Sequence, residues 1–520
     1  MIEQLQLSLS PEQAASDRGI RKGINEATGL QVKRISGYHI LKKSIDARGR
    51  QIRILLSLQV FIDEPLELRA AFDPGLRDVT YAPSVIIAGA GPAGLFAALR
   101  LISLGIKPII LERGKDVRSR RRDLAAMNKD GIVNPESNYC FGEGGAGTYS
   151  DGKLYTRSTK RGNVQRILDL FIHFGAEPNI GYEAHPHIGT NKLPQIISAM
   201  REQIIACGGE VRFDTKLTDI HIKDGAMAAV EVQGNEVIPC RQLILATGHS
   251  ARDIFELLER RQIAIEAKPF ALGVRIEHPQ ALIDSIQYHC ALRDDHLPPA
   301  SYSLVSQEQG RGVFSFCMCP GGIIAPAATE PGSIVVNGWS PSKRNNPYAN
   351  SGTVVAVDEK DYARYGFRGN LAGLAFQHMV EQRAFAAGGG NLVAPAQRMG
   401  DFVRGKVSGD LPKCSYLPGI SSAAMKDILP KEVHDALLTG VQAFGKKMKG
   451  YFTNEAILVA TESRTSSPVR IPRDKESLEH PQVKGLFPCA EGAGYAGGIV
   501  SAAIDGERCA ELAAAKVSRK

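Results

Sequence analysis

Alternating hydrophobic and polar positions at the start of the chain predict a β-strand over residues 2–9. Ser10-Pro11 follows directly, and a serine N-cap with proline at the first helical position predicts the start of a helix. Two further apolar runs, residues 35–44 and 52–62, flank a short polar turn and predict a hairpin. The order strand, helix, strand, strand predicts a small α+β module over residues 1–82, of ferredoxin-like type.

A different pattern begins after this module, where an apolar run of strand length leads into a glycine-rich turn, a helix and a second strand. Strands and helices then alternate, which predicts a Rossmann-like α/β domain whose first part covers residues 83–265. The further elements expected here are helices at 163–175 and 191–207 and strands at 211–213, 228–232 and 242–246.

Residues 266–450 have another character, because short β-like runs are broken by glycine and proline and are followed by two long helical stretches. We expect an α+β domain here, inserted into the α/β domain and suited to hold a substrate. The strand, turn and helix pattern returns in residues 451–520, which we expect to complete the α/β domain. The elements expected in the insert are strands at 271–277, 312–317 and 333–339 and helices at 371–387 and 432–449.

The turn after the first strand of the α/β domain is Gly89-Ala90-Gly91-Pro92-Ala93-Gly94, which matches G-x-G-x-x-G. Each glycine has a mechanical task in a dinucleotide site. Gly89 permits the tight turn, Gly91 leaves room for a pyrophosphate, and Gly94 lets the helix pack closely on the strand. The helix N-terminus offers free N–H groups and its positive dipole end to the phosphates. We therefore expect Gly89, Gly91, Pro92, Ala93 and Gly94 to bind a dinucleotide.

The second strand of this unit, residues 107–111, ends at Glu112. An acid about 20 residues beyond the glycines reaches a ribose hydroxyl in such sites. Glu112 is therefore predicted to bind the adenosine ribose, and the adjacent Arg113 is included in the predicted site. The alternative interpretation is a glycine-rich turn without a ligand.

Two further small-residue segments indicate FAD as the dinucleotide. The strand closed by Ala246-Thr247-Gly248 is similar to a short motif that passes beside the cofactor in flavoproteins with two dinucleotide sites. The loop over residues 141–153 has small residues whose N–H groups can line phosphate and flavin, although it can also be a surface loop. The residues assigned to the site from these segments are Gly145, Ala146, Gly147, Thr148, Thr247 and Gly248.

A third segment, residues 485–499, resembles the C-terminal FAD motif of the glutathione-reductase-like superfamily, in which an acid at a strand end binds the ribityl chain. Many members have aspartate where this chain has Glu491. A helix beginning near Ile499, after Gly497 and Gly498, is expected to direct its N-terminus at the flavin pyrimidine edge and stabilise reduced flavin. The sequence has no second G-x-G-x-x-G with strand context, so NAD(P)H is expected at most as a transient electron donor.

Together these segments resemble the uncharacterised FAD-dependent dehydrogenase family, whose members carry an N-terminal α+β module before the FAD domain. The resemblance spans nearly the whole chain. It implies a Rossmann-like FAD-binding domain with an inserted α+β substrate domain, and an oxidoreductase activity, but no particular substrate. The further matching strings are residues 44–48, 186–190, 316–322 and 462–470.

Five residues in glycine-rich or proline-rich segments are candidates for the chemistry. Arg464 can clamp a carboxylate or phosphate, and Glu462 can orient it or act as acid or base; alternatively both form an interdomain salt bridge. His187 is a candidate for proton transfer, or else a turn histidine bonded to backbone. Lys153 can neutralise reduced flavin or a substrate anion, or lie on a surface turn. Cys317 is a candidate flavin-facing thiol.

Cys317 and Cys319 share one face of a strand, where a disulfide between them would be strained. The alternative interpretation is two small buried hydrophobic residues. Arg118, Arg120, Arg121 and Arg122 form a basic run that favours a solvated helix face over a phosphate-binding patch. The sequence shows no metal-ligand spacing, so no metal site is expected.

The composition is that of an ordinary soluble globular protein, with 43% hydrophobic and 23% charged residues. We find no apolar run that could span a bilayer and no secretory signal at the N-terminus, and nine scattered cysteines fit a reduced, cytoplasmic setting. A net charge of +8 favours anionic ligands in general. The number of subunits is not predicted by the sequence.

Three functions are consistent with these features. The first is an FAD-dependent dehydrogenase or reductase acting on a small molecule. The second is a flavoenzyme that acts on RNA and grips it with the 1–82 module, for which the positive net charge and the arginine run are the only arguments. The third is a carrier or regulator that has the FAD fold without catalysis.

Overall fold

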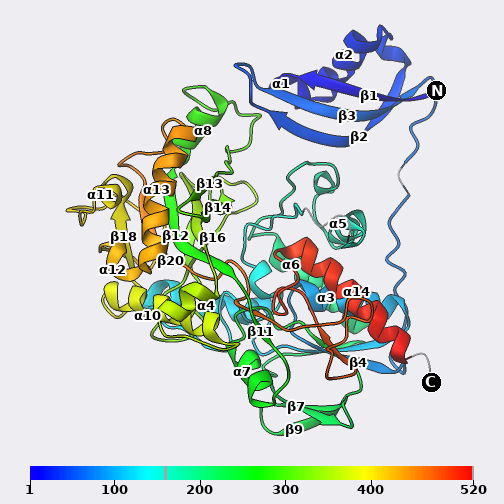
Figure 1. The fold of residues 1–520 in the computed structure, drawn as a ribbon. Coiled ribbons are helices and arrows are strands. Elements are labelled where there is room, and N and C mark those ends of the chain that lie inside the picture. The colour runs from blue at the N-terminus through cyan, green and yellow to red at the C-terminus, as the bar shows by residue number, and fades with distance from the viewer. Residues whose placement is uncertain (69, 157–160, 518–520) are drawn as a thin grey trace.

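The computed structural model describes residues 1–68, 70–156 and 161–517. Three units follow one another in Figure 1: a small N-terminal lobe, a domain built on a parallel sheet, and a domain built on a larger, mostly antiparallel sheet. The predicted α/β class with a parallel sheet is confirmed. No helix among the described residues is both long and apolar enough to cross a bilayer.

The N-terminal lobe contains an antiparallel sheet of order β1-β3-β2 with two helices. Its elements are β1 (Ile2–Leu9), α1 (Pro11–Ala14), α2 (Asp17–Thr28), β2 (Ile35–Asp46) and β3 (Arg53–Ile62). Ser10 caps α1 as predicted, because its Oγ accepts the Gln13 N–H at 3.2 Å while the Gln13 side chain accepts the Ser10 N–H at 3.0 Å.

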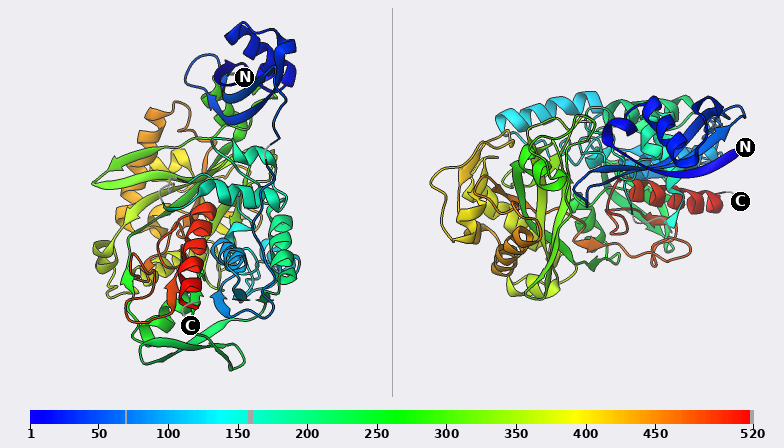
Figure 2. Two further views of the ribbon diagram at one scale, coloured as in Figure 1. Left: turned by 90° about the vertical axis from the view of Figure 1, so that its right-hand side faces the viewer. Right: turned by 90° about the horizontal axis from the view of Figure 1, so that it is seen from above.

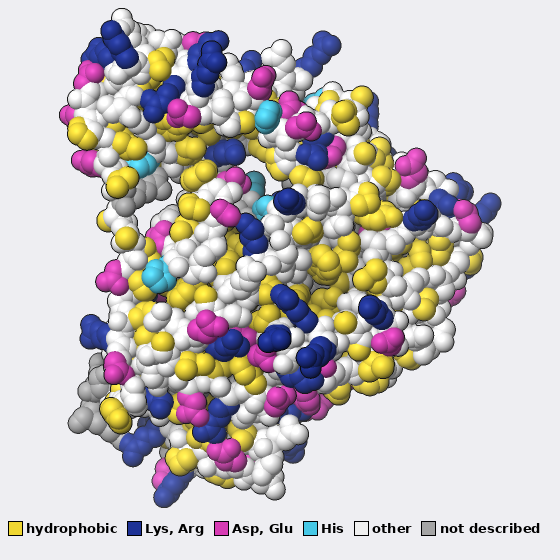
Figure 3. Space-filling view, turned by 180° about the vertical axis from the view of Figure 1, so that it is seen from behind, with side chains coloured by type: hydrophobic (Ala, Val, Ile, Leu, Met, Phe, Trp, Pro, Cys, Tyr) yellow, Lys and Arg dark blue, Asp and Glu magenta, His cyan; other side chains and the backbone are white. Residues whose placement is uncertain are grey.

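The lobe stands apart from the rest of the molecule, and Figure 3 shows an open notch between them on one face. It is attached along β2, where the Lys43 N–H donates to the Tyr182 carbonyl at 2.8 Å and the Ala184 N–H donates to the Lys43 carbonyl at 2.9 Å. Lys43 Nζ also lies 3.6 Å from the Glu183 carboxylate. The edge of the small sheet is therefore paired with the second unit at this point.

Five parallel strands form the centre of the second unit, in the order β22-β10-β4-β5-β6. Their bounds are β4 (Ser84–Ala88), β5 (Lys107–Leu111), β6 (Glu210–Arg212), β10 (Leu243–Leu245) and β22 (Leu486–Pro488). Val85 and Ile87 pack on one face of the sheet, and Ile86 and Ala88 pack on the other. The unbroken apolar run before Gly89 is therefore what a strand covered on both faces requires.

Helices cover the first face of this sheet, and a small antiparallel sheet and one helix cover the second. The first group is α3 (Pro92–Ser103), α5 (Val164–His173), α6 (Leu193–Ala206) and α14 (Ile499–Val517). The second group is β7 (Leu217–Lys223), β8 (Ala226–Val232), β9 (Glu236–Pro239) and α7 (Arg252–Arg260). In Figure 2, α14 lies along α3, and a Cβ at Gly506 would lie 2.1 Å from the Ala93 carbonyl oxygen.

The strand order reverses between β4 and β10. The chain runs outward from β4 to β5 and β6, and β10 and β22 are then added on the other side. Ligands of open parallel sheets bind outside the carboxyl ends of the strands at such a switch point. Gly89 follows β4 and Ala246 follows β10, so two of the predicted motifs meet at this edge.

The third unit is built on a seven-stranded sheet of order β13-β14-β17-β12-β20-β18-β19. Its strands are β12 (Phe270–Pro279), β13 (Val305–Glu308), β14 (Arg311–Cys319), β17 (Tyr348–Val357), β18 (Ala394–Arg398), β19 (Ile420–Ser422) and β20 (Ile457–Glu462). Because β20 pairs with β12 and β18, it belongs to this sheet and not to the returning part of the α/β domain, where the boundary expected at 450 placed it.

The long helices α10 (Ala372–Ala387) and α13 (Lys431–Lys447) lie within about two residues of their predicted bounds and pack against this sheet. The strand predicted at 333–339 is shorter and pairs outside the large sheet, with β15. The remaining elements are α4 (Val117–Asp130), β11 (Glu266–Ala267), α8 (Gln280–Tyr288), β15 (Ile323–Pro326), β16 (Val336–Trp339), α9 (Glu359–Arg364), α11 (Met399–Val403), α12 (Met425–Ile428) and β21 (Val469–Arg470).

Candidate functional site

The three glycines after β4 have the three properties that the motif predicts. Gly89 has a φ of +105°, and a Cβ there would lie 2.4 Å from the Ala246 carbonyl oxygen. A Cβ at Gly94 would lie 1.9 Å from the Gly89 carbonyl oxygen, so close packing of α3 on the turn requires glycine. A Cβ at Gly91 would meet nothing within 4 Å. Gly91 therefore borders open space at the N-terminus of α3, where a phosphate can approach the backbone.

The Glu112 carboxylate lies beside this turn and is only 5% exposed. Its Oε2 accepts the Ala90 N–H at 2.8 Å, and its Oε1 accepts the N–H groups of Gly114 and Gly142 at 2.9 Å. Three backbone donors thus fix the carboxylate at the end of β5. Its oxygens keep lone pairs with which to accept a ribose hydroxyl.

The loop after residue 140 packs directly on the glycine turn. The Gly144 N–H donates to the Ala90 carbonyl at 2.8 Å. A Cβ at Gly145 would lie 3.2 Å from Gly91 Cα. The loop is therefore not an unattached surface segment, and it forms a wall of the space beside Gly91.

The same loop also reaches the C-terminal FAD segment. A Cβ at Gly147 would lie 3.2 Å from Pro92 and 3.5 Å from Ile499, so three segments remote in sequence meet at Gly147. Thr148 is fully buried, and its hydroxyl donates to the Glu143 carbonyl at 2.7 Å. Its side chain thus holds the loop in shape, and Thr148 supports the predicted site without facing the open space beside Gly91.

Thr247 and Gly248 lie on the opposite side of the turn. A Cβ at Gly89 would lie 3.2 Å from Thr247 Cα, and a Cβ at Gly492 would lie 2.8 Å from the Gly248 carbonyl oxygen. This segment therefore separates the glycine turn from the strand end that carries Glu491.

Four glycines of the predicted site have open space where a Cβ would lie. No atom lies within 4 Å of that position at Gly91, Gly248, Gly497 or Gly498. The last two are exposed and directly precede α14. Two helix N-termini, a fixed acid at a strand end and bare backbone between them are the features that an extended dinucleotide requires. The residues present therefore fit FAD.

Arg113 is engaged within the protein. Its guanidinium pairs with Glu136 at 2.7 Å and Asp253 at 2.9 Å, and it lies 4.2 Å from the centroid of the Phe141 ring. Arg113 thus fixes the base of the 141–150 loop, and its charge is already compensated.

Arg120 contradicts the expectation of a solvated arginine face on α4. It is fully buried, and its guanidinium donates to the carbonyls of Asn138 at 2.8 Å, Glu143 at 2.8 Å and Gly145 at 2.9 Å. Arg120 therefore holds the loop that walls the cradle. The other members of the run, Arg118, Arg121 and Arg122, are exposed as expected.

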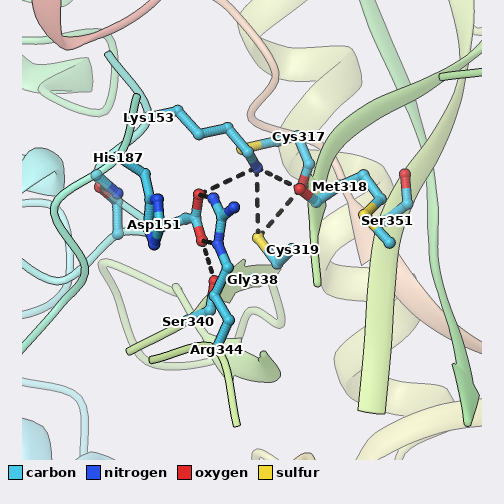
Figure 4. A network of polar contacts seen from close by, with 12 residues as sticks. Asp151, Lys153, His187, Cys317, Met318, Cys319, Gly338, Ser340, Arg344 and Ser351 are labelled. Atoms are coloured by element: carbon cyan, nitrogen blue, oxygen red, sulfur yellow. Dashed lines mark hydrogen bonds and ion pairs between the residues drawn. The ribbon is translucent and has the colours of Figure 1, made fainter. Parts of the chain in front are cut away.

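Lys153 reaches from the end of this loop to β14, as Figure 4 shows. Its Nζ lies 3.8 Å from Sγ of both Cys317 and Cys319, donates to the Met318 carbonyl, and lies 3.6 Å from the Asp151 carboxylate. Burial opposes the ammonium charge, but the two sulfurs and Asp151 outweigh burial and raise the pKa of Lys153. Lys153 is thus a cation directed at two thiols rather than a surface lysine.

The Asp151 carboxylate in turn pairs with Arg344 at 2.6 Å and accepts the Ser340 hydroxyl. Beside it, His187 Nε2 lies 3.1 Å from the Ser342 carbonyl oxygen. Burial and the charge of Arg344 lower the pKa of His187, so its imidazole is neutral at neutral pH. His187 has the backbone bond of a turn histidine, and it is part of the wall around Lys153.

Glu462 is paired with a different arginine from the one expected. Its Oε2 lies 2.7 Å from Nε of Arg275, in a pair with both side chains almost fully buried. Arg275 also donates to Asn350 at 2.7 Å, and its NH1 lies 3.8 Å from Cys319 Sγ. Gly338 makes room for this guanidinium, since a Cβ there would lie 2.1 Å from NH1. Glu462 therefore positions Arg275 under the two thiols.

Arg464 is held by Glu381 and not by Glu462. Its Nε and NH2 each lie 3.1 Å from a Glu381 oxygen, and its NH1 donates to Thr329 at 2.8 Å. Burial alone would raise the pKa of Glu381, but the charges of Arg252 and Arg464 outweigh it and lower the pKa to about 2. Arg464 thus occupies a buried ion network whose link to the second unit is Arg252 of α7, which pairs with Glu381 at 2.6 Å.

His249, which directly follows Gly248, was not predicted as a site residue. Its Nε2 lies 3.8 Å from the Glu491 carboxylate, and its buried Nδ1 has no hydrogen-bond partner among the described residues. Burial and the charge of Arg464 lower the pKa of His249 to about 4. Burial and the nearby Cys317 raise the pKa of Glu491 to about 7 although 32% of its side chain is exposed. The sequence feature that could have indicated His249 is its position directly after a predicted cofactor motif.

Two groups of potential metal ligands occur in the part of the chain that the structure describes, although no sequence spacing indicated them. They are Cys489, Asp505 and Cys509, and Glu330, His378 and Glu381. Arg473 pairs with Asp505 at 2.6 Å, and Arg252 pairs with Glu381 at 2.6 Å. In each group an arginine already compensates the carboxylate that a metal would need.

Two family models match parts of the chain. The family "FAD-dependent protein, C-terminal domain-like" matches residues 269–465, and a domain of unknown function, DUF8436, matches residues 1–61. Among solved structures, a geranylgeranyl bacteriochlorophyll reductase-like protein of Thermoplasma acidophilum is 12% identical, and a flavin-dependent brominase is 13% identical. Each comparison covers 84% of this chain and 79% of the other, with a TM-score of 0.36.

An uncharacterised protein of Clostridium beijerinckii matches from end to end. It is 42% identical over 531 residues, which cover 98% of this chain and 97% of that protein. The chain therefore belongs to the family of that uncharacterised protein. Its residues 269–465 match the C-terminal domain family of FAD-dependent proteins.

Proposed function

We propose that this protein is an FAD-dependent oxidoreductase that passes hydride between flavin N5 and a small organic substrate. The glycines with open space at their Cβ positions carry this proposal. They lie at the switch point of the parallel sheet, and the open space ends beside Glu491, close to Cys317 and Lys153. Flavin supplies the two-electron chemistry when bound, and the protein supplies position, charge and protons.

The chain's own residues divide this work. The open backbone at Gly91 and the N-terminus of α3 would hold the pyrophosphate, and the fixed carboxylate of Glu112 would hold the ribose. The N-terminus of α14, after Gly497 and Gly498, would place its positive dipole end at the flavin ring. The seven-stranded sheet closes the site from the opposite side through β14.

Two groups at this site are suited to hold or move a proton. A pKa of about 7 leaves Glu491 close to half protonated at neutral pH, so its Oε atoms can donate or accept. His249, 3.8 Å away, has a pKa of about 4 and stays neutral, so its ring N–H can orient the Glu491 carboxylate while Glu491 exchanges the proton. Lys153 remains charged and would stabilise an anion that forms beside the thiols.

Anaerobic titration of the purified protein tests the proposal. We expect a yellow protein whose flavin band is bleached by dithionite and by NADH, NADPH or a donor found by metabolite screening, and restored by a substrate. A colourless protein that cannot be reconstituted with FAD would contradict the proposal. Bound flavin that no donor except dithionite reduces would instead support the carrier alternative.

The RNA alternative has no specific structural support. On the face shown in Figure 3, basic and acidic side chains are interspersed over the lobe and the body. Phosphate-backbone binding needs clustered positive charge and makes affinity fall steeply with salt. Filter binding of tRNA at increasing salt separates this alternative from a small-molecule enzyme.

A further inference from the structure

The strand that carries Cys317 and Cys319 is interrupted at these residues. The pairing of β14 with β17 shifts register between Phe316 and Cys319, and Cys317 has a φ of +46°. A non-glycine residue in this region indicates local strain, which is frequent at functional sites. The strand is therefore irregular at these residues, although both sulfurs lie 3.8 Å from Lys153 Nζ.

The bulge exposes one cysteine and buries the other. Of the nine cysteines, all in the described part of the chain, Cys317 is the one with an exposed side chain. Cys319 is fully buried, and its Sγ lies 3.3 Å from the Cys317 carbonyl oxygen. A molecule entering the site can thus reach Cys317 first, with Cys319 directly behind it.

The charges around the pair favour one thiolate. Three cations face two carboxylates in this cluster, and the third acid near Cys317, Glu491, is about half protonated at neutral pH, so positive charge remains in excess. The cluster consists of Lys153, Arg275, Arg344, Asp151 and Glu462. The neighbouring Cys319 thiol lowers the pKa of Cys317, burial opposes this, and Lys153 and Arg275 lower it further. Cys319 uses its S–H to donate to the Cys317 carbonyl, so Cys317 is the cysteine of the pair that is suited to be the thiolate.

We propose that Cys317 and Cys319 form a redox-active dithiol that reduces disulfide substrates, with Cys317 as the attacking thiolate and Cys319 as the resolving thiol. Lys153 is a positioning residue that stabilises the attacking sulfur. This inference goes beyond the proposed function, because a single turnover needs only the chain's own residues.

The reaction balances without another reductant. The Cys317 thiolate attacks one sulfur of R–S–S–R′, which forms a mixed disulfide and releases R′S⁻. The proton of Cys319 passes to R′S⁻ and gives R′SH. The Cys319 thiolate then attacks Cys317 Sγ, which forms the Cys317–Cys319 disulfide and releases RS⁻. Two electrons have moved from the protein dithiol to the substrate.

The short spacing suits this role. A ring closed across one intervening residue is strained, and strained, accessible disulfides are the labile and catalytic ones. Residues 312–343 form one tryptic peptide that contains no cysteine except Cys317 and Cys319, so the product can be weighed directly.

Reaction with dithiobis(nitrobenzoic acid) tests the mechanism on the full-length protein. We expect the wild type to release two equivalents of thionitrobenzoate in a fast phase and its 312–343 peptide to lose two hydrogens. Cys319→Ser should release one equivalent and retain a mixed disulfide on Cys317. Cys317→Ser should lack the fast phase.

Two outcomes would overturn this inference: equal release by the wild type and Cys319→Ser, or a fast phase that persists in Cys317→Ser. Both outcomes are read from the release of thionitrobenzoate and not from the flavin spectrum. Either of them would therefore overturn the dithiol inference without contradicting the proposed FAD site. Conversely, a protein that binds no flavin but still releases thionitrobenzoate in two steps would contradict the proposed FAD site and support the dithiol inference.

The pH dependence of alkylation tests the role of Lys153. An ordinary thiol with a pKa of about 8.5 reacts about 80-fold more slowly at pH 6 than at pH 8, because its thiolate fraction falls. We expect less than about a threefold fall for Cys317. Lys153→Met should restore the steep profile, Lys153→Arg should keep the shallow one, and Lys192→Met, a control in an exposed ion pair, should match the wild type. A steep profile in the wild type would contradict the proposal.

Discussion

Replacing Gly91 with valine is expected to weaken FAD binding while the protein remains folded. A Cβ at Gly91 meets no atom within 4 Å, so the flavin-free fold can accept a side chain there. Gly91 is the N-cap of α3 but makes no side-chain cap, and a change at such a position costs about 1 kcal/mol or less. The open space is, however, the approach to the α3 N-terminus.

Filling that space should weaken FAD binding. Overpacking costs about 1–3 kcal/mol, which corresponds to a roughly 5- to 150-fold higher Kd. The substitution therefore destabilises the complex with FAD more than it destabilises the flavin-free protein. We expect Gly91→Val to purify with little flavin and to melt close to the flavin-free wild type.

The assay compares three variants by the ratio of flavin to protein absorbance, by FAD titration, and by thermal unfolding. Gly409→Val is the matched control, because Gly409 is an exposed glycine with no atom near its Cβ position and no positive φ. It should keep FAD. Gly94→Ala should unfold, because its Cβ would lie 1.9 Å from the Gly89 carbonyl oxygen. Stoichiometric FAD with an unchanged Kd in Gly91→Val would refute the reasoning.

Three further substitutions probe the supports of the site. Arg120→Met should lower the free energy of unfolding by about 3–5 kcal/mol in urea titrations, because two buried carbonyls and a half-buried one lose their donor. Arg464→Met should cost about 3 kcal/mol while the flavin spectrum stays unchanged; a shifted spectrum would instead place Arg464 at the flavin. Glu491, with a pKa of about 7 against an ordinary 4.5, binds more protons folded than unfolded between these values. The free energy of unfolding of the flavin-free protein should therefore fall as pH rises from about 4.5 to about 7. We expect a fall of about 1–2 kcal/mol, because partial exposure of the side chain to solvent weakens the effect. Glu491→Gln should lack this fall when Tm is measured as a function of pH.

Local chemistry explains which parts of the site were predictable. The glycine turn, Glu112 and the start of α14 depend on backbone rules within a few residues, and all three lie where the pattern places them. The burial of Arg120 depends on a loop that folds back over α4, which no periodicity in the helix records.

The partners of the charged residues could not be predicted for the same reason. Glu462 pairs with Arg275, 187 positions away, and Arg464 pairs with Glu381, 83 positions away, because neighbouring strands and helices of the third unit bring them together. The bulge at Cys317 depends on how β14 pairs with β17. The sequence of residues Phe316–Cys319 alone therefore could not predict that the two thiols lie beside Lys153.

Identification of the bound cofactor tests the central claim most directly. The protein is purified without added flavin and denatured by heat, and the released compound is identified by chromatography and mass and counted against protein. We expect FAD at close to one molecule per chain in the wild type and a strongly reduced amount in Gly91→Val. Release of FMN or of no flavin, with no FAD taken up on reconstitution, would contradict the claim.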